Sequence, residues 1–209
     1  MAKDGIRQFV VGHLSTNCYA LVSDGECLVV DPGAEGARIA AALSDVKVTQ
    51  IVATHGHHDH VGGVRALKEA TGASFAVSVG DAERAQHALE LSSHVFDVSQ
   101  AEVEDAPAPD RQLSEGDVLR VGSAELRVLE APGHTEGGIV LVGDGYAFMG
   151  DTLFAGSCGR TDLVGGDHET LMRTLARLKR EIDPATVLLC GHGPATTMEQ
   201  ELAYNPWLA

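Results

Sequence analysis

Residues 54–60, which read Thr-His-Gly-His-His-Asp-His, constrain the fold more than any other feature of the sequence. They place five metal-competent side chains within six positions, after the apolar run at residues 50–53 and before a helical pattern. Imidazole and carboxylate groups bind zinc, iron and manganese, and a loop between a strand and a helix can direct several of them to one point. Gly56 lets the backbone turn between the first two histidines. The segment therefore predicts a metal site at the end of a strand.

Three later segments repeat this arrangement, because in each a ligand-type residue beside glycine follows an apolar strand pattern. The three residues are His134, Asp151 and His192. Strand ends can meet along one rim of a sheet sandwich, so these side chains can join the residues of the first loop at a common site.

The composition is typical of one soluble domain. A chain of 209 residues is too short for two ordinary domains and a linker, so we predict a single domain over residues 1–209. Hydrophobic residues make up 44% and charged residues 22%, near the average for globular proteins. No apolar run approaches the roughly 20 residues of a membrane-spanning helix, and no secretory signal follows Met1. We therefore expect a cytoplasmic protein with no membrane partner.

The charge balance bears on the partners of the protein. Fifteen basic and thirty acidic residues give a formal net charge of −15, which disfavours binding to RNA or DNA. We expect a small-molecule substrate and no nucleic-acid partner. No exposed apolar stripe or heptad pattern indicates an oligomeric state, which the sequence leaves open.

The order of the predicted elements indicates an α/β fold, of the α+β kind with four layers. Strand patterns occupy residues 8–11, 18–22, 27–30, 46–54, 74–79, 117–121, 125–129, 139–142, 146–149 and 186–190. Helical patterns occupy residues 34–43, 61–70, 81–91 and 168–180, with a short terminal helix after them. Residues 102–110 predict a surface loop. Each half supplies hairpins and then helices, which predicts two mixed sheets packed face to face with helices outside.

Taken together, these motifs resemble those of the metallo-β-lactamase-fold hydrolase superfamily, and most closely its glyoxalase II-type (hydroxyacylglutathione hydrolase) branch in a short single-domain form. The resemblance covers about residues 8–206 and includes five superfamily motifs in order. Asp31 matches the first motif and His55-x-His57-x-Asp59-His60 the second. The third, fourth and fifth are matched by His134, Asp151 and His192. The resemblance implies an αβ/βα sandwich.

The same resemblance implies a ligand set for two divalent metal ions per chain. Zinc is the first choice, and iron or manganese is compatible with the same side chains. The implied ligands are His55, His57 and His134 for one ion and Asp59, His60 and His192 for the other, with Asp151 bridging. Asp31 is implied to orient the ligand loop without binding metal. The remaining histidines, which match no ligand position and are read as surface or packing residues, are His13, His58, His87, His94 and His168.

The implied chemistry is hydrolysis of thioesters of the hydroxyacylglutathione type. Two divalent ions about 3.5 to 4 Å apart can share one water and lower its pKa toward about 7, which supplies a bridging hydroxide as nucleophile. Asp59 is expected to be catalytic, because it can accept a hydrogen bond from that hydroxide as well as bind metal. No serine or cysteine nucleophile is required, and no Gly-x-Ser-x-Gly motif is present.

The residues expected to bind substrate depart from the glyoxalase II pattern. Arg160 matches a basic residue that contacts glutathione in that family, whereas Asp162 stands where a tyrosine is expected. After His192 the sequence runs only to Ala209, where the typical glyoxalase II carries a helical domain that completes the thiol pocket. We therefore expect a more open pocket with Arg160 in its wall.

Two other activities on the same fold remain alternatives. A persulfide dioxygenase binds one iron through residues matching His55, His134 and Asp151, and its loop also reads Gly-Arg-Thr-Asp, as residues 159–162 do here. Metal analysis and oxygen uptake separate it from a hydrolase. A lactonase is a further alternative. A non-catalytic interaction protein is disfavoured, because assembling a complete ligand set buries several polar groups.

Overall fold

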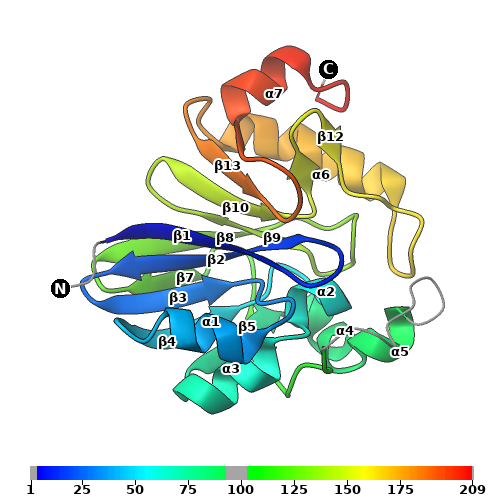
Figure 1. Cartoon of the computed structure of the whole chain (residues 1–209). Coiled ribbons are helices and arrows are strands. Elements are labelled where there is room, and N and C mark those ends of the chain that lie inside the picture. The colour runs from blue at the N-terminus through cyan, green and yellow to red at the C-terminus, as the bar shows by residue number, and fades with distance from the viewer. Residues whose placement is uncertain (1–3, 93–102, 209) are drawn as a thin grey trace.

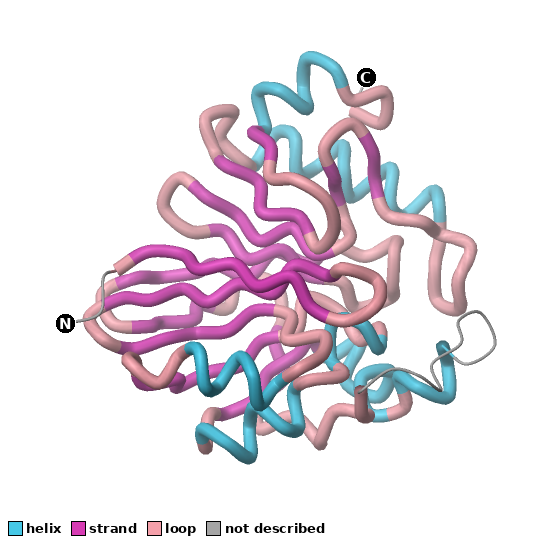
Figure 2. Tube along the Cα trace, in the orientation of Figure 1, coloured by secondary structure: helices cyan, strands magenta, loops and turns pink. Residues whose placement is uncertain are grey.

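In the computed structural model, which describes residues 4–92 and 103–208, two six-stranded sheets pack face to face. Helices cover the outer face of each sheet, so the described chain has four layers (Figure 1). Figure 2 shows the strands in the middle and most of the helices at the two outer sides. This arrangement confirms the predicted α/β sandwich with helices outside.

The first sheet keeps the order of the sequence. It consists of β1 (Gly5–Val11), β2 (Thr16–Ser23), β3 (Glu26–Val30), β4 (Lys47–Val52), β5 (Ser74–Ser78) and β6 (Arg111–Leu113). The first two pairs are antiparallel, and the last three pairs are parallel. The sheet is therefore mixed, as predicted.

The second sheet also keeps the order of the sequence. It consists of β14 (Thr196–Thr197), β13 (Val187–Cys190), β10 (Tyr146–Gly150), β9 (Ile139–Val142), β8 (Ala124–Glu130) and β7 (Val118–Val121). Among the described strands of this sheet, β10 and β13 pair in parallel and the other neighbours are antiparallel. A separate hairpin pairs β11 (Leu153–Phe154) with β12 (Ser157–Cys158).

The helices lie between and after these strands. They are α1 (Gly36–Ala42), α2 (His58–Val61), α3 (Val64–Thr71), α4 (Ala82–Gln86), α5 (Ala88–Ser92), α6 (His168–Glu181) and α7 (Met198–Tyr204), with a 3₁₀ turn at Val79–Asp81. None of the helices in the described ranges is both long enough and apolar enough to span a membrane.

Strand β2 shows why the sheets have two apolar faces. Its side chains alternate between the faces, as the pleat of a strand requires. Cys18, Ala20 and Val22 pack in the cluster beneath α1 and α3, whereas Tyr19 and Leu21 pack against the second sheet. A third cluster lies between the second sheet and α6, whose buried leucines recur at helical spacing. Three apolar layers therefore hold the four layers of secondary structure together.

The helix predicted over residues 81–91 is interrupted at His87. In a continuous helix the Leu89 N–H would bind the Ala85 carbonyl. Here the Ala85 carbonyl accepts from the Ala106 N–H at 3.0 Å, and the Leu89 N–H donates to Asp105 at 2.9 Å. The segment at residues 103–110, predicted as a loop, thus takes both hydrogen-bonding groups and divides the helix; residue 102 lies outside the described residues.

The helix predicted over residues 61–70 begins earlier and is divided at Gly62 and Gly63. Its first turn, α2, starts at His58, and the second piece is α3. A Cβ on Gly63 would lie 2.7 Å from the Pro32 carbonyl oxygen, so only glycine fits this close approach. Asp59 and His60 thus lie on α2, the short helical turn that ends the ligand loop.

Candidate metal centre

The ligand loop leaves the end of β4 beside Asp31, which follows the neighbouring parallel strand β3. Asp31 Oδ1 accepts a hydrogen bond from the Thr54 N–H at 2.7 Å, and its Oδ2 accepts from the Thr54 hydroxyl at 2.7 Å. The same Oδ2 lies 3.0 Å from Nδ1 of His60. Asp31 therefore holds the loop and directs Nε2 of His60 toward the other donors.

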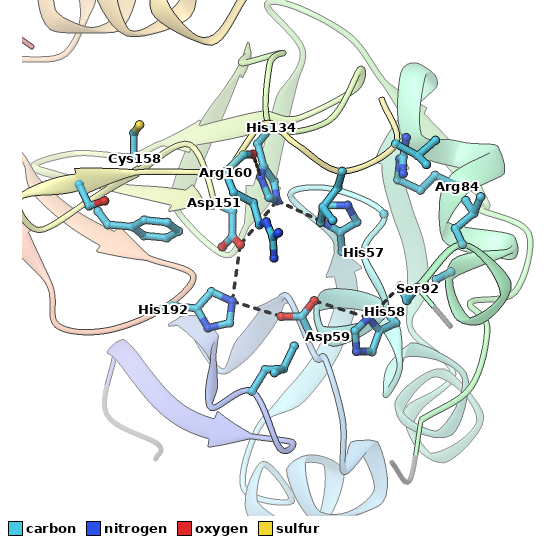
Figure 3. A pocket seen from close by; sticks show the side chains of 18 residues that line it. His57, His58, Asp59, Arg84, Ser92, His134, Asp151, Cys158, Arg160 and His192 are labelled. Atoms are coloured by element: carbon cyan, nitrogen blue, oxygen red, sulfur yellow. Dashed lines mark hydrogen bonds and ion pairs between the residues drawn. The ribbon is translucent and has the colours of Figure 1, made fainter. Parts of the chain in front are cut away.

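The second sheet contributes from three strand ends. His134 follows β8, Asp151 follows β10 and His192 follows β13. Nδ1 of His134 lies 2.7 Å from the carbonyl oxygen of Arg160, which leaves its Nε2 toward the centre. Figure 3 shows His134, Asp151 and His192 pointing toward His57 and Asp59 of the loop.

All seven side chains predicted as metal ligands converge in the structure. Nδ1 of His57 lies 3.0 Å from Nε2 of His134, and Nε2 of His60 lies 3.3 Å from Oδ1 of Asp151. Nε2 of His192 lies 3.1 Å from Oδ2 of Asp59. Three groups of donor atoms lie within 4.8 Å of one another: His55, His57 and His134; His55, His60 and Asp151; and Asp59, His60 and His192.

Several of these donors lack the hydrogen bonds that buried polar atoms normally make. Nε2 of His55, Nε2 of His60 and Oδ1 of Asp151 are buried and have no hydrogen-bond partner among the described residues. Leaving such atoms without a partner is unfavourable unless a ligand binds them. Imidazole nitrogens and carboxylate oxygens suit divalent ions such as zinc, iron or manganese. The residues present thus fit two adjoining metal ions.

The electrostatics of the cluster favour cations. Burial lowers the pKa of His55 well below its usual value and that of His57 to about 3, which keeps both rings neutral, the form that binds metal. Burial opposes ionisation of Asp59, but the charge of His60 and a hydrogen bond from His192 lower its pKa. The pKa of His60 is raised, because Asp151, Asp59 and Asp31 outweigh its burial. The carboxylates thus create a negative potential where the donors meet.

The donors form one end of a pocket of about 480 Å³. Its walls are largely apolar and come from loops and helices of both halves. The apolar wall residues are Leu14, Ala88, Leu91, Phe154, Leu163 and Val164. A polar floor beneath apolar walls can hold a small organic substrate against the donors.

The other histidines belong to none of the donor groups in the described chain. His58 is buried, stacks on His13 with ring centroids 5.8 Å apart, and has Nδ1 2.9 Å from the Ser92 hydroxyl. His87 and His168 are exposed. His94 lies outside the described residues.

Arg160 lies in the pocket wall, as expected, with its side chain 47% exposed. Its Nε and Nη2 donate to the two oxygens of Asp162 at 2.7 and 2.8 Å. Asp162, which stands where the glyoxalase II pattern has a tyrosine, is therefore the hydrogen-bond partner of Arg160. Contact of Arg160 with a substrate stays a prediction.

Two residues at the site were not identified from the sequence. Asp81 is fully buried and accepts hydrogen bonds from the N–H groups of Gly56 at 2.8 Å and Gly137 at 2.9 Å, so it connects the ligand loop to the second half. Arg84 on α4 lines the pocket. Neither residue has a motif, since an aspartate and an arginine three positions apart in a helical pattern are typical of a solvated face.

Comparisons with known proteins agree with the geometry. A family model described as the metallo-beta-lactamase superfamily matches residues 11–192, a range that includes every predicted metal ligand. The hydroxyacylglutathione hydrolase GloC of Haemophilus influenzae is 33% identical over 198 residues, which are 92% of this chain and 92% of that protein.

Solved structures extend the likeness to nearly the whole chain. The BLEG-1 B3 metallo-beta-lactamase superposes with a TM-score of 0.89 at 30% identity, covering 98% of this chain and 100% of that one. TTHA1623, solved in a di-iron-bound form, superposes with a TM-score of 0.85 at 32% identity, covering 97% and 100% of the two chains.

Proposed function

Because the chain belongs to the metallo-beta-lactamase superfamily, we propose that this metallo-hydrolase cleaves thioesters of the hydroxyacylglutathione type. The observation that supports it most is the complete set of seven converging donors at the floor of an apolar-walled pocket. The similarity to the H. influenzae hydrolase extends over the whole of this site.

The residues divide between two ions, for which zinc is our first choice. His55, His57 and His134 would hold one ion, Asp59, His60 and His192 the other, and Asp151 would contact both. Such a pair supplies a Lewis acid for the carbonyl oxygen and an acidified water for the attack.

The protein's own residues would orient the reacting groups and hold the hydrogen bonds of the attacking water. The Thr16 hydroxyl donates to Oδ2 of Asp59 at 3.0 Å and so fixes the carboxylate that we propose as the catalytic residue. Asp59 would accept a hydrogen bond from the attacking water and so orient it, because its lowered pKa keeps the carboxylate ionised. The apolar walls, among them Leu91, Phe154 and Leu163, would exclude bulk water from the scissile bond.

The test is a hydrolysis assay on protein of known metal content. We expect S-lactoylglutathione to be hydrolysed, the activity to disappear with a chelator, and added zinc to restore it. A lactone panel and a β-lactam belong in the same assay, the latter because BLEG-1 is a metallo-beta-lactamase. If a lactone or the β-lactam were hydrolysed faster than S-lactoylglutathione, that compound class would be the substrate in place of the thioester.

The alternative in the same family is a persulfide dioxygenase with a single iron. The observation that favours it is the Gly-Arg-Thr-Asp loop at residues 159–162, together with the presence of His55, His134 and Asp151 among the converging donors. One iron per chain and oxygen uptake with glutathione persulfide, without thioester hydrolysis, would establish this reading and exclude ours.

A further inference from the structure

Arg84 is a buried cation in the wall of the metal pocket. Its side chain is only 8% exposed, although it lines the same pocket as the metal donors. In Figure 3 it lies beyond His57, on the side away from His192. A guanidinium is charged under all ordinary conditions, so burial at this place needs a compensating interaction.

The protein provides only part of that compensation. The closest carboxylate among the described residues is that of Asp81, whose Oδ1 lies 3.6 Å from Nε of Arg84, beyond a normal hydrogen bond. Both oxygens of Asp81 already accept from backbone N–H groups, those of Gly56 and Gly137. Nε of Arg84 is buried with no hydrogen-bond partner among the described residues. The pair balances charge but leaves Nε of the guanidinium without a hydrogen bond.

The surroundings hold the guanidinium in place. A Cβ added to Gly56, between two of the metal ligands, would lie 2.9 Å from Cγ of Arg84. A Cβ added to Gly165, which has a φ of 81°, would overlap Nη2 of Arg84. The side chain is thus packed between the ligand loop and the loop after Leu163. Such packing orients the fork of N–H donors before any ligand arrives.

The contrast with Arg160 is informative. The guanidinium of Arg160 is half exposed and donates twice to Asp162, so its charge and donors are already matched. Arg84 is more buried and less matched. The whole chain carries a formal charge of −15, so a cation in the pocket wall, in addition to the metal ions proposed at the donors, would favour binding of an anionic ligand.

We propose that Arg84 binds a carboxylate of the substrate, so that the pocket selects acyl compounds carrying an anionic group a short distance from the scissile bond. The planar guanidinium fork matches a carboxylate, and a charge-assisted pair of this kind is among the stronger polar contacts. This proposal depends on the proposed thioester hydrolysis in one respect only, namely that the scissile bond is a thioester. The carboxylate can lie in either the thiol half or the acyl half of the substrate.

Binding of ligands that lack a thioester tests the proposal separately from thioester hydrolysis. Isothermal titration calorimetry on zinc-loaded protein would compare two acid and ester pairs. S-hexylglutathione and its dimethyl ester vary the thiol half, and N-hexyladipamic acid and its methyl ester vary the acyl half. In the wild type we expect one acid to bind about 10- to 100-fold more tightly than its ester.

Three variants identify the cation responsible. Arg84→Gln should reduce the acid preference to about 3-fold or less while ester binding stays within about 2-fold, which shows an intact pocket. Arg160→Gln should reduce the ratio of acid to ester affinity less than Arg84→Gln does, because the charge of Arg160 is already matched by Asp162. Arg173→Gln, which removes an exposed arginine of α6, is the matched control for the change in net charge. If Arg84→Gln does not fold, Gly165→Ala displaces the guanidinium and should reduce the preference in the same way.

Each outcome decides the matter. Equal affinities for acid and ester in both wild-type pairs, or a preference lost in Arg160→Gln and kept in Arg84→Gln, would overturn the proposal. An Arg84-dependent preference without hydrolysis of S-lactoylglutathione would overturn the proposed function and leave the carboxylate site standing. Hydrolysis of S-lactoylglutathione without an Arg84-dependent preference would support the proposed function and overturn the carboxylate site.

Discussion

The two halves of the molecule supply the same metal centre in different ways. The first half delivers its donors from one loop, residues 55–60, which buried side chains hold: Asp31 contacts His60 and Asp81 contacts the loop backbone. The second half delivers single donors from strand ends, and His134 is oriented by a main-chain carbonyl. The loop should therefore be sensitive to remote side-chain substitutions, and the strand-end donors should be insensitive to them.

The largest expected effect tests whether the halves share one centre. His57→Ala in the first half and His134→Ala in the second should each lower kcat/KM for S-lactoylglutathione about 1000-fold or more, since each removes a metal donor. Bound metal, measured by elemental analysis, should fall in both variants. His168→Ala, outside every donor group, is the control and should keep activity within about 2-fold. Normal activity in either donor variant would show that the halves act independently.

The next effect tests the contact between the halves. Asp81→Ala removes the carboxylate that accepts from the N–H groups of Gly56 and Gly137, and it leaves Arg84 without its ion-pair partner in the described part of the chain. We expect the free energy of unfolding to fall by about 3 kcal/mol, since a buried charge is left unpaired. Urea unfolding measures it. Asp45→Ala, in an exposed ion pair with Arg7, is the control and should leave the midpoint unchanged. A midpoint equal to wild type for Asp81→Ala would contradict the bridging role.

A smaller effect sharpens the contrast on the side of the loop. Asp31→Asn preserves size but replaces one carboxylate oxygen by an NH₂ group. This group cannot accept a hydrogen bond, so one of the hydrogen bonds from Thr54 or His60 is lost. We expect zinc affinity to fall about 10- to 100-fold, as for other residues that orient metal-bound histidines. Competition with a chromophoric chelator measures the change. Unaltered affinity would show that the loop holds its shape without Asp31.

The smallest effect is expected on the side of the strand ends. Arg160→Ala removes a side chain but keeps the carbonyl that orients His134. Zinc affinity should therefore stay within about 2-fold of wild type in the same competition experiment. A loss of more than 10-fold would mean that side chains orient the second half as well, and the distinction between the halves would fail.

The sequence was most informative where structure is local. Alternating apolar residues predicted most strands, and the order of strands and helices predicted the sandwich that the structure and the family match confirm. The short strands β6, β11, β12 and β14 were not predicted, because two or three residues carry no period. The continuous helix at residues 81–91 was wrong, since Ala106 and Asp105 take the hydrogen bonds of Ala85 and Leu89. Such competition comes from a distant segment and leaves no local pattern.

By itself the sequence determined which side chains can bind metal and that several of them must lie together. Residues 55–60 are so close in sequence that, in any short loop, their side chains can reach a common point. Only the tertiary structure decided which charges in the pocket are matched. Arg84 and Arg160 are alike as residues, but one is enclosed by Gly56 and Gly165 and the other is exposed beside Asp162. The cost of leaving a charge without hydrogen bonds depends on what excludes water around it, and those neighbours come from segments far apart in the chain.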